Sequence, residues 1–428
     1  MNFLSKILKI NRTAGNRALA LDIGTETTKA LIFKIDPKEE KGIIIGAGKE
    51  RYMNKSLQDE TMANFDRALS SCRKAIEKAG RMAGPIPKKA VVGVGGGLIR
   101  GKTTTVTYER ANPKSKISPV ELKNIIHKIQ WKAFDTIKRE LSREAGGGSG
   151  EIKLINARIV SIEIDGYQVS NPLGFQGKAI SVSVFNSYAF LVHLGALQNV
   201  ADSLGIELLN IVSEPCAIVE FIQNQEEENE SFHSLQPDNI FINVGGKVTD
   251  VILARNGGIE ESKIFSLGGR IFTERLADEL NVDFKKAEEI KIDYSKGRLN
   301  SELSAKIEKI FSADGNIWLS GVRLSLAEFS GTDLLPSNIL LCGGGSALPI
   351  IERLLKKSFW TKNLPFAKKP KIGFMRPSEA INVVDKTEKL NSLQDITSIG
   401  LVKSTLDLSK KKKSISKILE RTIRIIQN

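Results

Sequence analysis

One stretch of the sequence matches a known phosphate-binding pattern. In VVGVGGGLIRGKTTTV, residues 91–106, the spacing G-x-x-x-x-G-K-T of a P-loop runs from Gly96 to Thr103. A P-loop binds phosphate because a helix begins at its lysine and points its first N–H groups at the anion. Here Lys102 is followed by a run of β-branched residues, which favours a strand. We therefore expect a turn between two strands here, and we look elsewhere for the phosphate site.

Two other segments, one in each half of the chain, share a pattern that suits phosphate. They are LALDIGTETTKALIF, residues 19–33, and IFINVGGKVTDVILA, residues 240–254. Each has an apolar strand, an acid or amide, a glycine turn and a second apolar strand. Glycines at a hairpin tip expose backbone N–H groups that a phosphate can approach closely. Two such tips facing each other across a cleft would bind the phosphates of one nucleotide from both sides.

A third motif lies in ILLCGGGSALPIIERLLK, residues 339–356. It has the pattern of a buried strand, three glycines and the start of a helix, which we expect Ser346 to cap. Glycines at this position would let the backbone pack against a flat ring or a sugar. Taken alone, the segment could equally be a close-packed turn between a strand and a helix.

The elements that must position these motifs alternate along the chain. Strands interleave with helices throughout, which predicts an α/β fold. Apolar residues at helical spacing predict helices over residues 61–80, 118–144, 188–204, most of 271–330 and 392–404. The acidic stretch QNQEEENES, residues 223–231, is expected to be solvated and functionally silent.

Composition limits the class of protein. The 428 residues are too many for one core, so we expect two or more domains. A net charge of +14 favours an anionic partner, but no basic module with interleaved aromatics points to nucleic acid. The three cysteines form no CxxC pair, which favours a reducing compartment without a zinc site. No apolar run spans a membrane and no signal peptide is recognised, so we expect a cytoplasmic protein.

The three motifs together resemble those of the actin-like ATPase superfamily. DIGTETTK is similar to its first phosphate motif, NVGGKVTD to its second and LCGGGSALP to its adenosine motif. Within the superfamily the chain most resembles the FtsA family of bacterial cell-division proteins. DGYQVSNPLGFQGKAISVSV, residues 165–184, resembles the end of that family's extra subdomain, and SLGGRIFTERLADEL resembles the stretch after its second phosphate loop. The resemblance covers residues 18–406.

The resemblance implies a two-lobed, actin-like α/β fold with an inserted subdomain and a C-terminal amphipathic helix. The implied parts are a basic N-terminal segment (1–15), subdomain 1A (16–96, 185–212 and 380–406), an inserted subdomain 1C (97–184), subdomain 2A (213–270 and 331–379), subdomain 2B (271–330), and a short linker with a membrane-targeting helix (407–428).

The resemblance also implies a Mg²⁺–ATP site. The residues that would surround the phosphates are Gly24, Thr25, Thr27, Thr28 and Lys29 from the first half, and Gly245, Gly246, Lys247 and Thr249 from the second. Asp22 would hold Mg²⁺ through water, because magnesium keeps most of its hydration shell. Glu214 would be a catalytic carboxyl group opposite the γ-phosphate. Glu288 and Lys291 would flank the base and ribose, unless they form an ordinary exposed helix pair. Gly343, Gly344 and Gly345 would contact the adenosine.

One position departs from the superfamily pattern. The second phosphate motif normally begins with an aspartate, and here Asn243 stands in its place. Asparagine is neutral and cannot act as a general base. Lys247 also replaces a glycine, and it could either add positive charge at the phosphates or point into solvent. We therefore expect ATP binding with slow or absent hydrolysis.

The C-terminal segment KKKKSISKILERTIRIIQN suits a membrane surface. Its apolar residues fall on one helical stripe behind a run of four lysines. The residues expected to contact the membrane are Lys410, Lys411, Lys412, Lys413, Ile415, Ile418, Leu419 and Ile426. A helix docked on its own globular body is the alternative. One such tail would bind anionic lipid weakly, whereas a polymer presenting many tails would bind firmly.

These expectations lead to one functional hypothesis and two alternatives. The resemblance implies an adaptor that polymerises into filaments on the inner face of the cytoplasmic membrane at the division site. There it would bind the C-terminal peptide of the tubulin-like protein FtsZ. The first alternative is a scaffold of type IV pilus assembly like PilM. The second is a catalytic member of the superfamily, a sugar kinase or a chaperone, which Asn243 and the lack of residues for a substrate domain disfavour.

Overall fold

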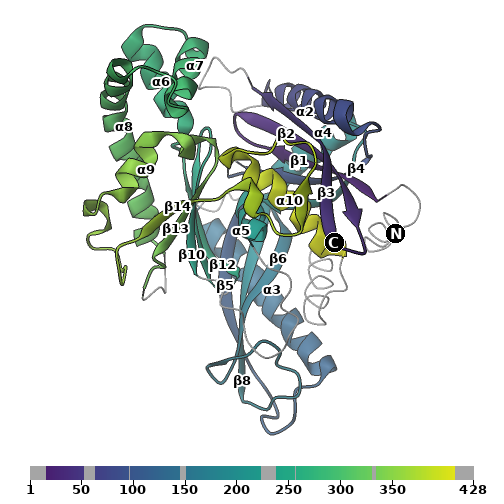
Figure 1. The fold of residues 1–428 in the computed structure, drawn as a ribbon. Coiled ribbons are helices and arrows are strands. Elements are labelled where there is room, and N and C mark those ends of the chain that lie inside the picture. The colour runs from purple at the N-terminus through teal and green to yellow at the C-terminus, as the bar shows by residue number, and fades with distance from the viewer. Residues whose placement is uncertain are drawn as a thin grey trace.

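The structure, a computed structural model, describes residues 16–52, 63–95, 97–144, 151–222, 238–255, 257–329 and 334–409. Several predicted features lie outside these residues: the N-terminal segment 1–15, Gly96, the acidic stretch 223–231, and the basic segment from Lys410 onward with its expected membrane contacts. Within the described ranges two lobes lie beside each other, and a narrower inserted part projects from them (Figure 1).

The first lobe, lobe 1, is built on a six-stranded sheet. In spatial order its strands are β15 (Val383–Asp385), β3 (Lys41–Arg51), β2 (Thr27–Asp36), β1 (Arg17–Ile23), β4 (Lys89–Val94) and β9 (Glu207–Ser213). Helices α2 (Ala63–Ala83) and α4 (Leu191–Ser203) cover one face. Both faces of β1 are buried, with Leu19 and Leu21 against α2 and Ala18 and Ala20 on the other side. This explains why the strand reads as a continuous apolar run.

The second lobe, lobe 2, repeats the start of the first. In spatial order its strands are β12 (Gly258–Phe265), β11 (Thr249–Arg255), β10 (Asn239–Val244), β13 (Asn338–Cys342) and β14 (Lys371–Phe374). As β1 pairs antiparallel with β2 and parallel with β4, so β10 pairs antiparallel with β11 and parallel with β13. The outer face is covered by α6 (Gly269–Leu280), α7 (Phe284–Ser295), α8 (Ser301–Ala327) and α9 (Pro349–Lys356). The two similar hairpins predicted from sequence therefore begin two similar sheets.

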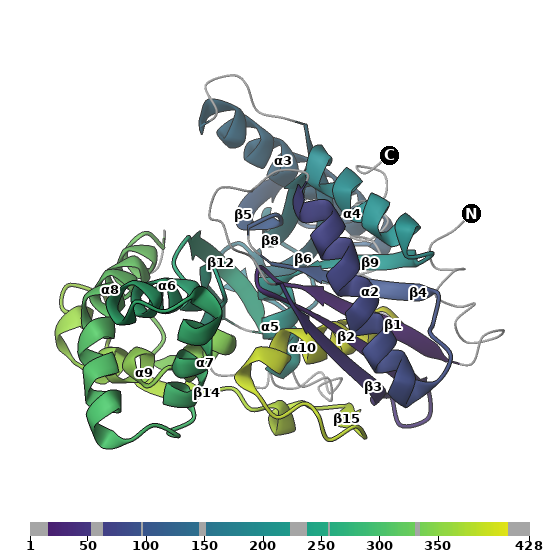
Figure 2. The same cartoon turned by 90° about the horizontal axis from the view of Figure 1, so that it is seen from above.

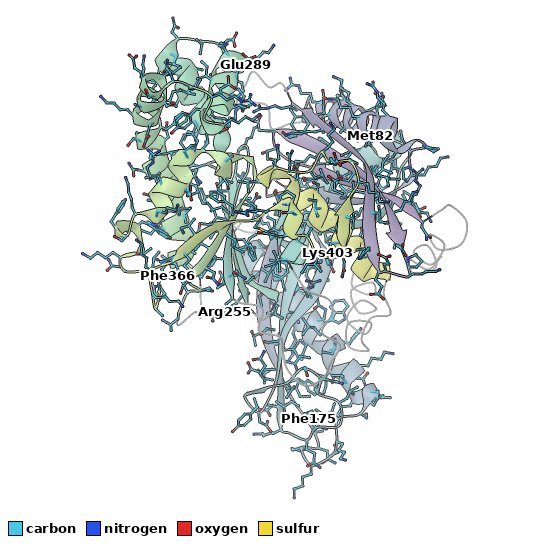
Figure 3. All side chains as sticks on the ribbon, in the orientation of Figure 1. Met82, Phe175, Arg255, Glu289, Phe366 and Lys403 are labelled. Atoms are coloured by element: carbon cyan, nitrogen blue, oxygen red, sulfur yellow. The ribbon has the colours of Figure 1, made fainter. Side chains whose placement is uncertain are left out.

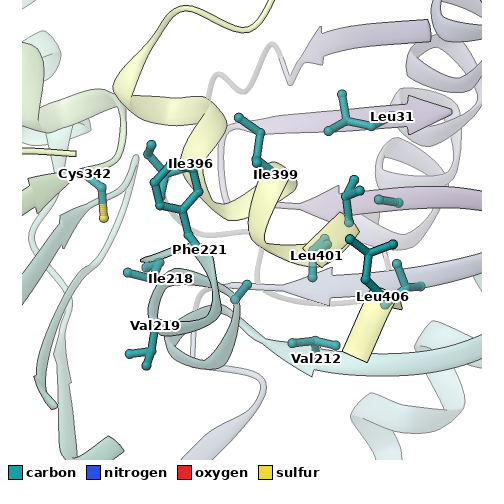
Figure 4. Close-up of a cluster of buried hydrophobic side chains, with 14 of the residues drawn as sticks. Leu31, Val212, Ile218, Val219, Phe221, Cys342, Ile396, Ile399, Leu401 and Leu406 are labelled. Atoms are coloured by element: carbon teal, nitrogen blue, oxygen red, sulfur yellow. The ribbon is translucent and has the colours of Figure 1, made fainter. Parts of the chain in front are cut away.

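Two helices lie between the sheets and join the lobes. They are α5 (Glu214–Ile222) and α10 (Ile396–Ser409). Figure 4 shows Ile218 and Phe221 of α5 beside Ile396, Ile399 and Leu401 of α10, in one buried apolar cluster. The cluster also takes in side chains of both sheets, such as Phe33 and Phe241. Seen from above, α10 lies between the α6–α9 group and the strands of lobe 1 (Figure 2).

The inserted part is a four-stranded sheet with one long helix. Its strands are, in spatial order, β5 (Arg100–Glu109), β8 (Ala179–Phe190), β6 (Ile152–Ile164) and β7 (Tyr167–Gln168), and its helix is α3 (Pro119–Glu144). The insertion leaves lobe 1 after β4 and returns to it at α4. Lys102 lies within β5 and not at the start of a helix, so the structure confirms that the P-loop pattern is not a P-loop.

The actin-like α/β fold with an inserted part agrees with the expected architecture. The subdomain boundaries drawn from the resemblance stay a prediction. None of the helices among the described residues is long and apolar enough to cross a membrane.

Candidate functional site

The first hairpin tip is closed by its own backbone. The N–H of Gly24 donates to the carbonyl of Thr27 at 3.1 Å, which makes the turn between β1 and β2. Just below the turn Asp22 faces Lys29 across the two strands, and Lys29 Nζ lies 2.8 Å from Asp22 Oδ2. Lys29 also donates to the carbonyl of Gln394, in the short turn just before α10. Burial disfavours the ammonium charge, but the Asp22 carboxylate outweighs it and raises the pKa of Lys29.

The second tip has the same construction with the charges rearranged. The N–H of Gly245 donates to the carbonyl of Val248 at 2.9 Å. Below this turn Asn243 faces Asp250, and Asn243 Nδ2 donates to Asp250 Oδ2 at 3.1 Å. The strand that ends in asparagine is thus paired with a strand that carries a carboxylate. Asp250 was not among the predicted site residues, although the alignment of the two hairpins places it opposite Asn243, where Lys29 is opposite Asp22.

Two predicted phosphate contacts point away from the space between the lobes. Thr28 hydrogen-bonds to the hydroxyl of Tyr52 at 2.7 Å, and its side chain faces α2. Thr249 donates to the carbonyl of Leu267 at 2.6 Å and accepts a hydrogen bond from Trp318 Nε1 at 3.0 Å. The prediction that these two hydroxyls line the phosphate site is therefore wrong. The reason is the two-residue period of a strand, because Lys29 and Asp250, the next residues along, take the inner face.

The two tips face each other, as the sequence predicted, and they are in direct contact. The N–H of Lys247 donates to Thr25 Oγ1 at 3.2 Å across the lobes. A Cβ on Gly246 would overlap the side chain of Glu26, so only glycine fits at that point. Glu26 in turn pairs with Arg270 Nη1 at 2.8 Å. The predicted phosphate-binding segments thus converge from opposite lobes.

A cluster of carboxyl groups lies behind the tips. Glu214 is the first residue of α5, and Thr397 of α10 approaches its Oε1 at 3.5 Å. Burial raises the pKa of Glu214 well above the usual carboxyl range, and the neighbouring Asp250 and Asp22 raise it further. Burial also raises the pKa of Asp250. Asp395, at the start of α10, is a third buried carboxyl with a raised pKa, against the pull of Lys29.

These carboxyls fit a magnesium site reached through water. Oxygen ligands and retained hydration are what Mg²⁺ prefers. Among the described residues no group of three or more His, Cys, Asp or Glu side chains is arranged to hold a metal directly. Asp22, the predicted magnesium residue, is 3 % exposed and already paired with Lys29, so its role would run through water. Asp395 carries no local sequence signal, because only the fold brings it close to Lys29.

The predicted adenosine residues are buried in lobe 2. Helix α7 begins after Asp283, whose carboxylate accepts the Lys286 N–H at 2.8 Å. Lys291 Nζ lies 2.8 Å from Glu288 Oε2 and donates to Thr273 Oγ1 at 2.7 Å. Glu288 and Lys291 are 8 % and 9 % exposed, so the alternative of an ordinary exposed pair is wrong. Arg51 of lobe 1 reaches across to Glu288 Oε1 at 2.8 Å.

The glycine segment after β13 joins the same region. A Cβ on Gly269, at the start of α6, would lie 3.4 Å from the Cα of Gly345 and 3.7 Å from Lys291 Nζ. Gly343 has a φ of +83°, which glycine adopts without strain. Glycines thus let the backbone of the second tip, the start of α6 and this segment pack closely together, and we call these three segments the glycine cradle. A cradle of this kind fits a flat ring and a sugar.

One detail of that segment differs from the prediction. Ser346 does not cap the helix, because its Oγ donates to the carbonyl of Cys342. The glycines first form a 3₁₀ turn, η1 (Gly344–Ala347), and α9 begins at Pro349 with Leu348 at its N-cap. Proline favours the first position of a helix, since it lacks an N–H that would otherwise go unsatisfied there.

The fold and this site together define a class of protein. Two lobes with duplicated hairpins, tips in contact and a glycine cradle beside them form the actin-like ATPase fold. A solved structure described as the PilM-PilN type IV pilus biogenesis complex has the same fold, with a TM-score of 0.64 and 18 % identity. The match covers 92 % of this chain and 99 % of that chain.

Sequence comparison finds similarity to one family within that class. Residues 240–391 match the family model described as "Cell division protein FtsA". The chain is 23 % identical over 369 residues to cell division protein FtsA of Pseudomonas aeruginosa, covering 81 % of this chain and 82 % of that protein. It is 19 % identical over 420 residues to FtsA of Enterococcus hirae, covering 91 % and 87 %. The chain is thus similar to the FtsA cell-division proteins over most of its length, as its motifs indicated.

Proposed function

We propose that the chain is an ATP-binding, actin-like cell-division protein that polymerises on the inner face of the cytoplasmic membrane and tethers FtsZ to it. The observation that carries the nucleotide part is the convergence of the two hairpin tips beside the glycine cradle. The cell-division part rests on the FtsA homologues.

In this proposal different groups of the chain bind the phosphates, the ribose and the base of the nucleotide. Backbone N–H groups at Gly24, Thr25, Gly245 and Gly246 bind phosphate, with the side chain of Thr27 and the charges of Lys29 and Lys247 beside them. Glu288 and Lys291 orient the ribose and base, and Gly343, Gly344 and Gly345 pack against the adenosine. Asp22 and Asp250 would hold Mg²⁺ through its water ligands, and the ion would supply positive charge to neutralise the phosphates.

Hydrolysis is proposed to be slow. Glu214 is the candidate for accepting a proton from water, but its raised pKa means that the carboxyl holds its own proton when the site is empty. Asn243 is neutral and donates its amide hydrogen to Asp250, so it does not replace the missing carboxylate. Bound ATP is therefore expected to dissociate more often than it is hydrolysed.

Membrane attachment is assigned to residues 410–428 from their sequence. The structure describes the chain up to Ser409, the last residue of α10. Only Ser409 separates a version ending at Leu408 from the lysine run, so that truncation removes the proposed anchor and leaves α10 almost complete.

Two measurements test this function. Binding of ATP with Mg²⁺ to the full chain is expected by titration calorimetry, together with phosphate release far slower than nucleotide dissociation. Co-sedimentation with anionic vesicles is expected for the full chain and not for the version ending at Leu408, each measured with and without ATP. As a matched control, glutamine at 410–413 keeps the apolar stripe and should weaken vesicle binding, most of all at low salt. Nucleotide found beside Lys102, or an empty cleft in crystals soaked with ATP, contradicts the proposal.

A second function is favoured by one observation, the shared fold with the PilM-PilN complex. The chain would then be a scaffold of pilus assembly. Pull-down of the full chain with FtsZ and, separately, with a PilN-type pilus component discriminates the two. If the full chain retains the pilus component and does not retain FtsZ, the role in pilus assembly is favoured over the role in cell division.

A further inference from the structure

A buried ion pair lies where the two hairpin tips meet. Glu26 belongs to the first tip, and Arg270 is the second residue of α6 in lobe 2. Arg270 Nη1 lies 2.8 Å from Glu26 Oε1, and the two residues are 6 % and 9 % exposed, respectively. The backbone N–H of Arg270 donates to the carbonyl of Gly246 at 2.8 Å, so the arginine is attached to the second tip as well.

The guanidinium is held in place from two further sides. Its Nε donates to Glu274 Oε1 at 2.8 Å, one helical turn along α6. Its Cζ lies 4.6 Å from the centre of the Phe284 ring. A planar guanidinium fixed in this way presents its donors in a preset direction, which suits a carboxylate or a phosphate equally well.

The position of Glu26 conflicts with anion binding. Glu26 lies between Thr25 and Thr27 in the sequence, on the tip whose backbone is proposed to bind phosphate. A negative charge a few ångström from a phosphate repels it, unless a cation neutralises that charge. In the structure the neutralising cation is the guanidinium of Arg270, which pairs with the Glu26 carboxylate. Glu26 thus pairs with an arginine whose backbone N–H is hydrogen-bonded to the opposite tip.

We propose that Arg270 is a phosphate-binding residue of this chain and that Glu26 is a built-in competitor for it. When the site is empty, Glu26 takes the guanidinium. A bound polyphosphate takes it over, and Glu26 is then left to repel the ligand. Glu26 therefore lowers the affinity for phosphate-bearing ligands, and Arg270 raises it. The inference rests on the proposed function, since it places the phosphates at the two tips.

The two residues of the pair are therefore expected to act in opposite directions. Glu26→Gln removes the competing charge and should tighten ATP binding by about tenfold, and ADP binding by less. Arg270→Met removes a charged donor and should weaken ATP binding at least ~10-fold. Neither change should alter the affinity for adenosine by more than about twofold, because adenosine has no phosphate. A pair that only held the lobes together would give the same sign for both changes.

Calorimetric titration of the full chain with ATP, ADP and adenosine, in the presence of Mg²⁺, tests this. Arg275→Met is the matched control, because Arg275 is on the same helix and pairs at 2.7 Å with Asp314 inside lobe 2. It should leave all three affinities unchanged. If Arg270→Met does not fold, Arg270→Lys keeps the charge, loses the fork and should weaken ATP binding by a smaller factor.

The outcomes separate this inference from the proposed function. If the unmodified chain binds no adenine nucleotide, both this inference and the proposed function are overturned. If the unmodified chain binds ATP, weaker ATP binding by Glu26→Gln overturns only the role of this pair. ATP affinities of the arginine variants within twofold of the unmodified chain do the same. Equal effects on ATP and adenosine also overturn it, since they indicate a change of lobe packing.

Discussion

Replacement of Asn243 by aspartate would test the electrostatics of the site most directly. Asn243 is 1 % exposed, and its amide hydrogen-bonds to Asp250 at 3.1 Å. The Asn243→Asp change restores the aspartate of the superfamily motif, but it places a third carboxyl group beside Asp250 and Glu214. Since burial already raises the pKa of both of these groups, the site has little capacity for another negative charge.

The magnitude follows from the separation of the groups. At 3.1 Å and an effective dielectric constant of about 20, two carboxylates repel each other by ~5 kcal/mol. A proton shared between them relieves this repulsion, and holding that proton on an ordinary carboxyl costs about 1.4 kcal/mol for each pH unit above its pKa. We therefore expect Asn243→Asp to lower the free energy of unfolding by about 5 kcal/mol near pH 8, where the repulsion is the smaller cost, and by about 2 kcal/mol near pH 5.5, where a proton is held instead.

Urea unfolding of the full chain without nucleotide, at both pH values, measures this difference. Asn300→Asp is the control, because Asn300 caps α8 by accepting the Leu303 N–H at 2.8 Å and an aspartate does so equally well. It should change stability by only a few tenths of a kcal/mol. A variant as stable as the parent near pH 8 would refute the reasoning, because the site would then tolerate the extra charge. Mg²⁺ should restore part of the lost stability.

Three further outcomes are expected. The raised pKa of the Glu214 carboxyl lets the folded chain hold a proton that the unfolded chain releases. The protonated carboxyl therefore contributes stability that is complete at low pH and is lost as pH rises through the pKa of the folded state. Glu214→Gln should therefore flatten the fall in unfolding free energy between about pH 5.5 and about pH 8, and an unchanged slope would contradict this. Gly343→Ala should destabilise the chain by at least ~2 kcal/mol, because its φ is +83° and the new Cβ would overlap Asn243 Oδ1. Thermal unfolding checks this, with no loss if the turn rearranges freely. Trp318→Phe should lose about 1 kcal/mol in urea unfolding, since it removes the donor to Thr249, and a neutral effect would mean that water replaces the indole.

The sequence could predict those parts of the site that depend on local pattern. An apolar run, a glycine turn and a second apolar run define each hairpin within fifteen residues, so both hairpins and their duplication were visible. The inward position of Lys29 and Asp250 was also available, because the strand period that puts Asp22 on the inner face puts Thr28 on the outer one. Placing Thr28 at the phosphates overlooked that period.

Other parts of the site depend on contacts between distant segments. Glu26 and Arg270 are separated by 244 positions, and Lys29 and Gln394 by 365. Their pairing depends on how the lobes meet, and no periodicity or motif encodes it. The prediction that Ser346 caps a helix was wrong for a different reason. The serine precedes a helix, but Pro349 fixes the start of that helix three residues later.

The inserted part has contacts with both lobes. Its chain is continuous with lobe 1 at β4 and α4, and Thr103 Oγ1 donates to the carbonyl of Ile259 on β12, the edge strand of lobe 2, at 2.8 Å. Val160 also packs against Gly258 of that strand. Figure 3 shows Phe175 toward the far end of the insertion, well away from these contacts. A small rotation between the lobes that pivoted at this root would move the distal end farther than the root, as at the end of a lever arm. A molecule bound at that end would then be moved by a change in the angle between the lobes.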